Sequence, residues 1–482
     1  MRFRVPLLAA VLLAAFAAPL LAARATPRVE ALLGESSSPG DLRTRLFAYA
    51  DSLGTKTATA GFMAGDAWFY AGVSFDRGGK GDSAIWCYER AIATRNSTEE
   101  RRALAAALCR RQGPGDVKRA QSILRSVLNE PGAGDVIVGE MAWATFLAGQ
   151  ADSAAKWFAT SEHALSSDLE WRYRMGEVAL EQRDNKKAFR LLYPLAVLSY
   201  KQDVDVMDML KRAATDAIQP EKVAEEVDRG IHSREIGESK VVRAMGAKPV
   251  SLAGRDGFPL GAMIVAGSSQ KAQRAVVILA APGDTIASYD SLAIGLRGAG
   301  FATILLDPRG SGRSVGPDCP LPSTWRGREE FLHSLVADDI TVAFETLARK
   351  VRVDTTRYVV IASGSVASMA TEAAARDRRV LLLSLMSPNP AAVDRGTMRT
   401  WAASRRMPMF LTTAPEDYQS RDLVERIYQA TNRGDSRVIE ARVPGTGAQT
   451  IDSSADTRAR MIKWLRESWT ASTATRPTSP RK

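Results

Sequence analysis

Ser365 is the residue whose surroundings best suit a nucleophile. It lies between an apolar, strand-like run at residues 358–362 and a helix-like segment at residues 368–376. The positions two residues before and after it, Ser363 and Ala367, are small, as a tight and strained strand-to-helix turn requires. A serine at such a turn attacks an acyl carbonyl when a nearby base accepts its proton. The alternative is a plain turn with a capping serine.

A base and an acid must accompany such a serine. Of the three histidines, His163 and His232 fall in the helical first half, so only His333 shares the domain of Ser365. We expect His333 in a loop before a helix at residues 336–350, where a packing role is the alternative to catalysis. Asp417 follows a strand-like run at residues 409–412 and is the candidate acid that would orient an imidazole. Without a histidine partner, Asp417 is expected to cap a loop.

Several motifs around these residues resemble the α/β-hydrolase superfamily. Residues 301–314 carry its strand-and-loop signature, with Asp307-Pro308-Arg309-Gly310 at the centre, and the turn around Ser365 resembles its nucleophile elbow. Residues 442–448 resemble the segment in which the superfamily places its catalytic histidine, but Ala448 stands at the histidine position.

The resemblance also implies where an oxyanion hole would lie. Its backbone donors would be Val366 and Gly283, because Pro282 has no N–H to donate. Asp284 would place a negative charge beside the developing oxyanion, which disfavours acyl transfer.

Loss of the general base costs a serine hydrolase on the order of 10⁶-fold in rate. The sequence therefore favours a domain that has lost catalysis, a pseudoenzyme that binds a partner or ligand. The alternative is an active serine hydrolase of the carboxylesterase or peptidase type, in which Ser365 uses the displaced His333.

The first half of the chain carries a helical repeat. A small residue recurs after four predicted turns, with spacings of 36, 34 and 34 residues, at Ala84, Ala120, Ala154 and Ala188. A period near 34 residues with helix–turn–helix units resembles the tetratricopeptide family. Its aromatic residues are expected in the core, and the resemblance implies a concave face that binds a protein or peptide partner.

The remaining half alternates short apolar strands with amphipathic helices, which predicts an α/β layer fold. A hairpin at 250–265 is followed by predicted strands at 275–280, 303–306, 358–362, 381–385, 409–412 and 437–443 and a closing helix at 458–469. The expected order is a helical solenoid (41–219), a linker (220–249), a three-layer α/β-hydrolase-fold domain (250–470) and a disordered tail (471–482).

The N-terminus has the pattern of a secretory signal. Arg2 and Arg4 precede an apolar run at residues 5–21, and Ala23-Arg24-Ala25 forms a cleavage site. We expect residues 1–25 to be removed after Ala25 and the protein to be exported to the periplasm or secreted, without stable insertion in a membrane. An uncleaved membrane anchor is the alternative.

Composition excludes several other classes. The net charge is +11, but six of the basic residues belong to the signal and the tail, and no basic run interleaves with aromatic residues. Nucleic-acid binding is therefore not expected. Cys87, Cys109 and Cys319 lack metal-ligand spacing, so no zinc site is expected. No other metal and no cofactor is expected either. Cys87 and Cys109 could pair within one domain, although buried free thiols are commoner in such apolar contexts.

Overall fold

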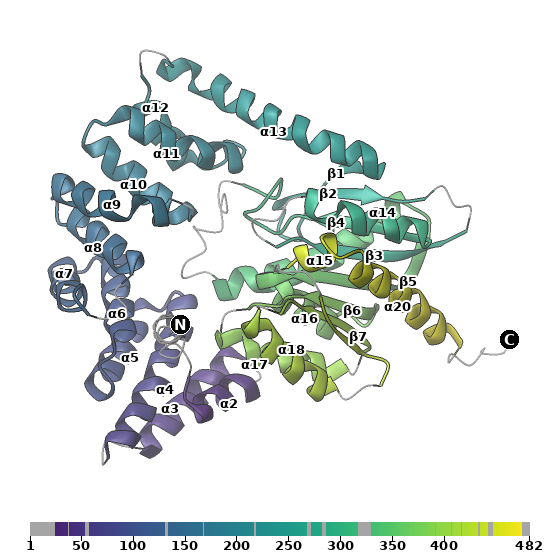
Figure 1. The fold of residues 1–482 in the computed structure, drawn as a ribbon, viewed down its shortest axis with the longest axis horizontal. Coiled ribbons are helices and arrows are strands. Elements are labelled where there is room, and N and C mark those ends of the chain that lie inside the picture. Colours follow the sequence, from purple (N-terminus) through teal and green to yellow (C-terminus); the bar gives the residue numbers. More distant parts are fainter. Residues whose placement is uncertain are drawn as a thin grey trace, which may run out of the picture. The chain divides into compact units, whose positions relative to one another are not determined.

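The computed structural model describes residues 25–474 except 37, 54–56, 131–133, 167, 216–217, 268–270, 282–285, 317–328, 391, 406, 416, 432–433 and 442–446 (Figure 1). It divides into two compact units: the described residues up to Asp76 with Lys80–Leu165, and Arg77–Gly79 with the residues from Ser166 onwards. The sequence predicts a boundary further on, at residues 220–249, and that boundary stays a prediction. The predicted signal and tail lie outside the described residues, apart from Ala25 and residues 471–474.

Helices follow one another without strands through the first unit: α2 (Pro27–Glu35), α3 (Pro39–Leu53), α4 (Ala58–Arg77), α5 (Gly81–Thr94), α6 (Thr98–Arg111), α7 (Asp116–Val127), α8 (Asp135–Leu147) and α9 (Ala151–Leu165). Cys87 and Cys109 are buried thiols that do not form a disulfide with each other. Burial raises the pKa of Cys87 to about 12, which keeps it as an inert thiol.

The predicted turns of the repeat are present. Left-handed residues with φ of 69°, 81°, 78° and 59° occur at Gly79, Gly115, Gly149 and Arg183. The four repeated alanines are completely buried. A Cβ atom on Gly72 would lie 2.6 Å from the Tyr88 ring, and one on Gly176 would lie 2.6 Å from Leu192, so small residues let the paired helices approach. The structure therefore confirms packed helix pairs at the predicted spacing.

The second unit begins with further helices, α10 (Leu169–Glu181), α11 (Asn185–Leu198), α12 (Val204–Arg212), the short η1 (Pro220–Lys222) and α13 (Val223–Met245). The predicted linker is therefore mostly one long helix. Val223 and Val227 of α13 join the apolar cluster of α10–α12, whereas Met245 at its other end is buried in a cluster beneath the sheet.

An eight-stranded mixed sheet forms the rest of this unit: β1 (Lys248–Ala253), β2 (Pro259–Val265), β3 (Gln273–Leu279), β4 (Phe301–Leu306), β5 (Val353–Ser363), β6 (Val380–Met386), β7 (Met409–Thr413) and β8 (Arg437–Glu440). The strand order is β1-β2-β4-β3-β5-β6-β7-β8. β2 is antiparallel to β1 and β4, and the remaining neighbours are parallel. The predicted hairpin and strands are confirmed, with boundaries that differ by a few residues.

Helices cover both faces of the sheet (Figure 1). One face carries α15 (Glu329–Lys350), α16 (Ala367–Arg376), α17 (Arg395–Arg405) and α18 (Tyr418–Thr431); the other carries α14 (Asp290–Gly298), α19 (Gln449–Asp452) and α20 (Ala455–Ala474). Alternate residues of β3 serve the two layers, because Val277 packs with the first set and Val276 with the second. No helix in the described part of the chain is long and apolar enough to span a bilayer.

The loop after β4 fastens the hairpin to the domain. Arg309 is 3% exposed, and its guanidinium donates to Asp339 of α15 (2.7 Å) and to Asp256 in the hairpin turn (2.6 Å). Asp307 accepts the Arg313 N–H at 3.0 Å. Gly312 has a φ of +53°, and a Cβ there would collide with the Asp307 carboxylate at 2.4 Å. These contacts give the motif a structural role that needs no reaction chemistry.

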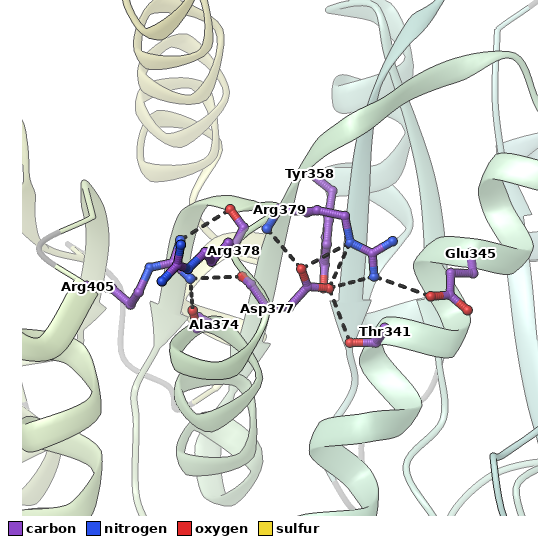
Figure 2. Close-up of polar contacts among 8 residues, drawn as sticks. All are labelled: Thr341, Glu345, Tyr358, Ala374, Asp377, Arg378, Arg379 and Arg405. Atoms are coloured by element: carbon purple, nitrogen blue, oxygen red, sulfur yellow. Dashed lines mark hydrogen bonds and ion pairs between the residues drawn. The ribbon is translucent and has the colours of Figure 1, made fainter.

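A second polar cluster lies near the amino ends of β5 and β6 (Figure 2). The Asp377 carboxylate accepts hydrogen bonds from the Tyr358 hydroxyl (3.1 Å) and from Arg379 Nη2 (2.8 Å), which also reaches Glu345 (3.3 Å). Burial alone would raise the pKa of Asp377, but the bonds from Arg379 outweigh it and the pKa is lowered. Phe344 stacks on Tyr358 with ring centroids 4.1 Å apart, so the cluster joins α15 to both strands.

Candidate active site

The turn after β5 differs by one residue from its predicted register. β5 ends at Ser363, and the short turn η4 (Gly364–Val366) leads into α16. The left-handed residue is Gly364, with a φ of +55°, and Ser365 is not among the described residues with positive φ. The sequence places Ser365 at the strained apex, whereas the structure places glycine there. At the apex itself there is no side chain to act as a nucleophile.

Ser365 lies one position beyond the apex, and its side chain is exposed. Within the described residues no hydrogen bond involves its Oγ, while its carbonyl oxygen accepts one from Ser368 Oγ at 3.4 Å. A serine hydroxyl without a hydrogen-bonded base is a weak nucleophile. Ser365 therefore has the environment of an ordinary residue in the short turn that precedes α16.

Asp417 begins a helix. Its Oδ1 accepts the backbone N–H of Ser420 at 3.1 Å, and its carbonyl oxygen accepts that of Arg421 at 3.0 Å. This is the geometry of an N-cap at the start of α18. The carboxylate thus has a structural partner that requires no imidazole, in agreement with the capping alternative.

His333 lies inside α15 and not in the loop that the sequence predicts. The helix begins at Glu329, earlier than residue 336, so His333 falls in its second turn. Its side chain is 19% exposed, and its Nδ1 lies 3.9 Å from Asp394 in the short turn η5 (Ala392–Asp394). Burial lowers the pKa of His333 to about 4, although Asp394 acts in the opposite direction. In the described structure no contact joins His333 to Ser365.

Ala448 directly precedes α19 and is 1% exposed. Its side chain belongs to the apolar cluster that contains Ile451 and Trp464. The neighbouring residue, Gly447, is the one that approaches the β5 turn, because a Cβ there would lie 3.6 Å from Ser363 Cβ. Position 448, where the resemblance places a catalytic histidine, therefore faces a packed apolar layer.

Tyr289 fills the space beside the turn, and sequence reasoning did not select it. It is 1% exposed in η2 (Ile286–Tyr289), and its hydroxyl and Ser363 Oγ are 2.7 Å apart. The Ala281 N–H donates to the same hydroxyl at 3.4 Å. In the sequence, Tyr289 is an isolated tyrosine after a predicted strand, and no motif indicates that it contacts Ser363.

The two predicted oxyanion donors have different outcomes. Val366 is completely buried at the start of α16, but with Gly364 at the apex the N–H that follows the apex belongs to Ser365. Gly283 lies outside the described residues, as do Pro282 and Asp284. No pair of donors around a reacting atom is therefore established.

A cavity of about 540 Å³ lies elsewhere, at the amino ends of β3 and β5. Arg274, Arg357 and Trp469 are among its lining residues. The amino ends are opposite to the carboxyl ends at which the β5 turn lies, so this cavity is separate from the predicted site. Among the described residues, no group of three or more His, Cys, Asp and Glu side chains is placed to hold a metal ion.

Comparisons with known proteins give only structural neighbours of low sequence identity. No protein-family model and no curated protein matches the chain. Solved structures similar to it include the esterase domain of a Rhodothermus marinus protein (TM-score 0.35, 12% identity, 46% of this chain and 98% of that one). The Pyrococcus horikoshii acylaminoacyl peptidase is similar with a TM-score of 0.36 and 12% identity, over 49% of this chain and 43% of the peptidase. An esterase from the archaeon Pyrobaculum calidifontis has a TM-score of 0.36 and 16% identity, over 50% of this chain and 90% of the esterase.

The strand order, the antiparallel β2 and the tight turn that follows β5 are those of the α/β-hydrolase fold. The C-terminal half of the chain therefore has this fold, preceded by an all-helical region. Whether it catalyses a reaction depends on the side chains at the turn.

Proposed function

We propose that this protein is exported and non-catalytic: a tetratricopeptide-like array binds a peptide or protein partner, and the α/β-hydrolase-fold domain has lost its reaction chemistry. The observation that carries the proposal is Gly364 at the left-handed position after β5. A nucleophile there would be held by the turn itself, and glycine supplies none. Ala448 supports the same conclusion, because the place of the histidine belongs to an apolar cluster.

The array is supported by its regular turns and by exposed aromatic surface. Trp86 is 43% exposed and Phe62 is 48% exposed, which is unusual for side chains of this size. Arg90 lies 4.2 Å from the centroid of the Trp86 ring. Aromatic residues and arginine are the types enriched where protein partners bind.

The competing function is that of an active serine hydrolase, and the position and pKa of His333 argue against it. A base must reach the serine hydroxyl, but His333 is a partly buried residue of α15 whose Nδ1 lies 3.9 Å from Asp394. The lowered pKa of His333, about 4, would also make it a poor proton acceptor at neutral pH.

A fluorophosphonate probe tests this function directly. At neutral pH we expect no labelling of the full protein above the level of the Ser365→Ala variant. Ser368→Ala is the matched control, since Ser368 lies in the same turn region. Fast labelling that Ser365→Ala abolishes and Ser368→Ala leaves intact would overturn the non-catalytic assignment. Its loss in His333→Gln as well would establish the displaced base.

A further inference from the structure

Among its described residues, the helical unit contains a buried cluster in which one arginine is paired with two carboxylates. Asp66 of α4 and Glu100 of α6 are each 1% exposed, and Arg95 lies between them. Arg95 Nη1 is 2.6 Å from Asp66 Oδ1, and its Nε is 3.4 Å from Glu100 Oε1. One guanidinium therefore faces two carboxylates. Burial raises the pKa of Glu100, although hydrogen bonds with Ser97 and the charge of Arg95 act in the opposite direction.

Thr26 meets this cluster with its backbone nitrogen. The Thr26 N–H donates to Asp66 Oδ2 at 2.6 Å, and its hydroxyl donates to the same oxygen at 2.9 Å. Thr26 directly precedes α2, yet its hydroxyl does not cap that helix. It is bound instead to a residue 40 positions away. Val29 and Leu32 of α2 are buried, so the helix packs against the unit from this anchoring point.

Thr26 is also the residue that follows Ala25, the predicted end of the signal. Removal of residues 1–25 would convert its amide nitrogen into an α-ammonium group with a full positive charge. We propose that Asp66 is the binding site for this new ammonium group, and that cleavage thereby completes the docking of α2. The added charge would balance the second carboxylate of the cluster. This inference rests on the proposed cleavage after Ala25.

The charged groups around the site set the expected pH dependence. Tyr49 of α3 and the half-exposed Arg28 of α2 lie near it, and Arg95 and Glu100 complete the surroundings. An unpaired α-amino group titrates near pH ~8. Pairing with Asp66 would raise that value in the folded state. The stabilisation is then fully present below pH ~8 and is lost as the pH rises through the higher folded value.

Periodate oxidation provides a direct test on the mature protein isolated after export. Periodate cleaves an N-terminal threonine between Cα and Cβ, and it needs the free amine and the hydroxyl together. We expect slow oxidation of the native protein and fast oxidation after denaturation. Asp66→Asn should oxidise at least about tenfold faster than the native wild type, the factor that corresponds to ~1.4 kcal/mol. Asp51→Asn, an exposed acid on α3, should stay slow.

The outcomes separate the two proposals. A denatured chain that resists periodate does not begin at Thr26, which refutes the cleavage site and this inference with it. Equal rates in native, denatured and Asp66→Asn protein would refute the ammonium site while the cleavage stands. If Asp66→Asn does not fold, the melting temperature of wild type with a free or an acetylated N-terminus replaces it. The free form should be more stable below pH ~8, and equal melting temperatures would overturn the proposal.

Discussion

At the scale of single residues, the backbone at Gly364 decides what the β5 turn can do. A Cβ at this position would lie 3.5 Å from Ala281 Cβ, which is ordinary contact, so space does not exclude a larger residue. The cost lies in the left-handed conformation, about 1–2 kcal/mol for an L-residue. Gly364→Ser should therefore fold but lose about that amount of stability in urea unfolding. Gly434→Ala, at an open glycine without positive φ, is the control and should be neutral; equal effects would contradict the strain.

Position 448 has a different constraint. Because Ala448 is buried in an apolar cluster, Ala448→His inserts a large polar ring into a packed layer. We expect a loss of about 1–3 kcal/mol and no gain in hydrolysis of p-nitrophenyl acetate. Gln449→His, at the exposed neighbouring position, controls for the chemistry of the ring. A rise of about 10²-fold or more in Ala448→His alone would show that the position does reach a nucleophile.

His333 should be visible in the pH dependence of stability. Its folded pKa of about 4 is below the ordinary value near ~6.5, so the unfolded chain binds a proton first as the pH falls. The contribution is fully present above pH ~6.5 and declines down to pH ~4. Thermal melts across this window should fall more steeply for wild type than for His333→Gln, which cannot titrate. Parallel curves would mean that the imidazole is hydrated.

At the scale of elements, the sequence predicts types better than registers. Alternation of apolar runs and amphipathic segments identifies the strands and most helices, because burial on two faces of a sheet leaves a strong pattern. The register of the turn after β5 is ambiguous in the sequence. Ser363 and Ala367 are suitable flanks for an apex at Ser365, and Ala362 and Val366 are suitable flanks for an apex at Gly364. Only the backbone φ of Gly364 decides between the two registers.

The missed positions have related physical reasons. No capping motif in the sequence indicates that α15 begins before Val336. The sequence therefore predicts a loop position for His333. The direction of the Ala448 side chain depends on how α19 packs against distant residues such as Trp464, which local sequence does not encode. The Tyr289–Ser363 contact joins residues 74 positions apart and depends in the same way on tertiary packing.

Arg405 hydrogen-bonds backbone carbonyl groups at the C-terminal end of α16. Its Nη1 donates to the carbonyl oxygens of Ala374 and Asp377, both at 3.0 Å, at the end of α16 (Figure 2). Arg405→Met keeps much of the apolar stem but removes the side-chain donor to both carbonyl oxygens; that of Asp377 keeps the Val380 N–H at 3.1 Å, whereas that of Ala374 loses its Arg405 bond. We expect a loss of about 1–3 kcal/mol in urea unfolding. Arg378→Met, which removes an exposed side chain in the same loop, should be nearly neutral. Equal losses would contradict a capping role for Arg405.

At the scale of the whole molecule, α13 determines where the second unit can be divided. Its first turns pack with α10–α12 through Val223 and Val227, and its last residue, Met245, is completely buried with the sheet. Arg297 of α14 also donates to the Met245 carbonyl oxygen. A cut within the predicted linker therefore removes material from the core that α14 and α20 share.

A comparison of two fragments tests this division. Residues 166–474 should unfold in one cooperative transition, because the described contacts group them as a single unit. Residues 246–474 lack Met245 and should melt lower, by an amount comparable to Met245→Ala in the longer fragment. Removal of a buried methionine typically costs about 2–5 kcal/mol. If the short fragment instead matches the longer one in midpoint and cooperativity, α13 is a linker as the sequence predicts, and the α/β-hydrolase fold is complete without it.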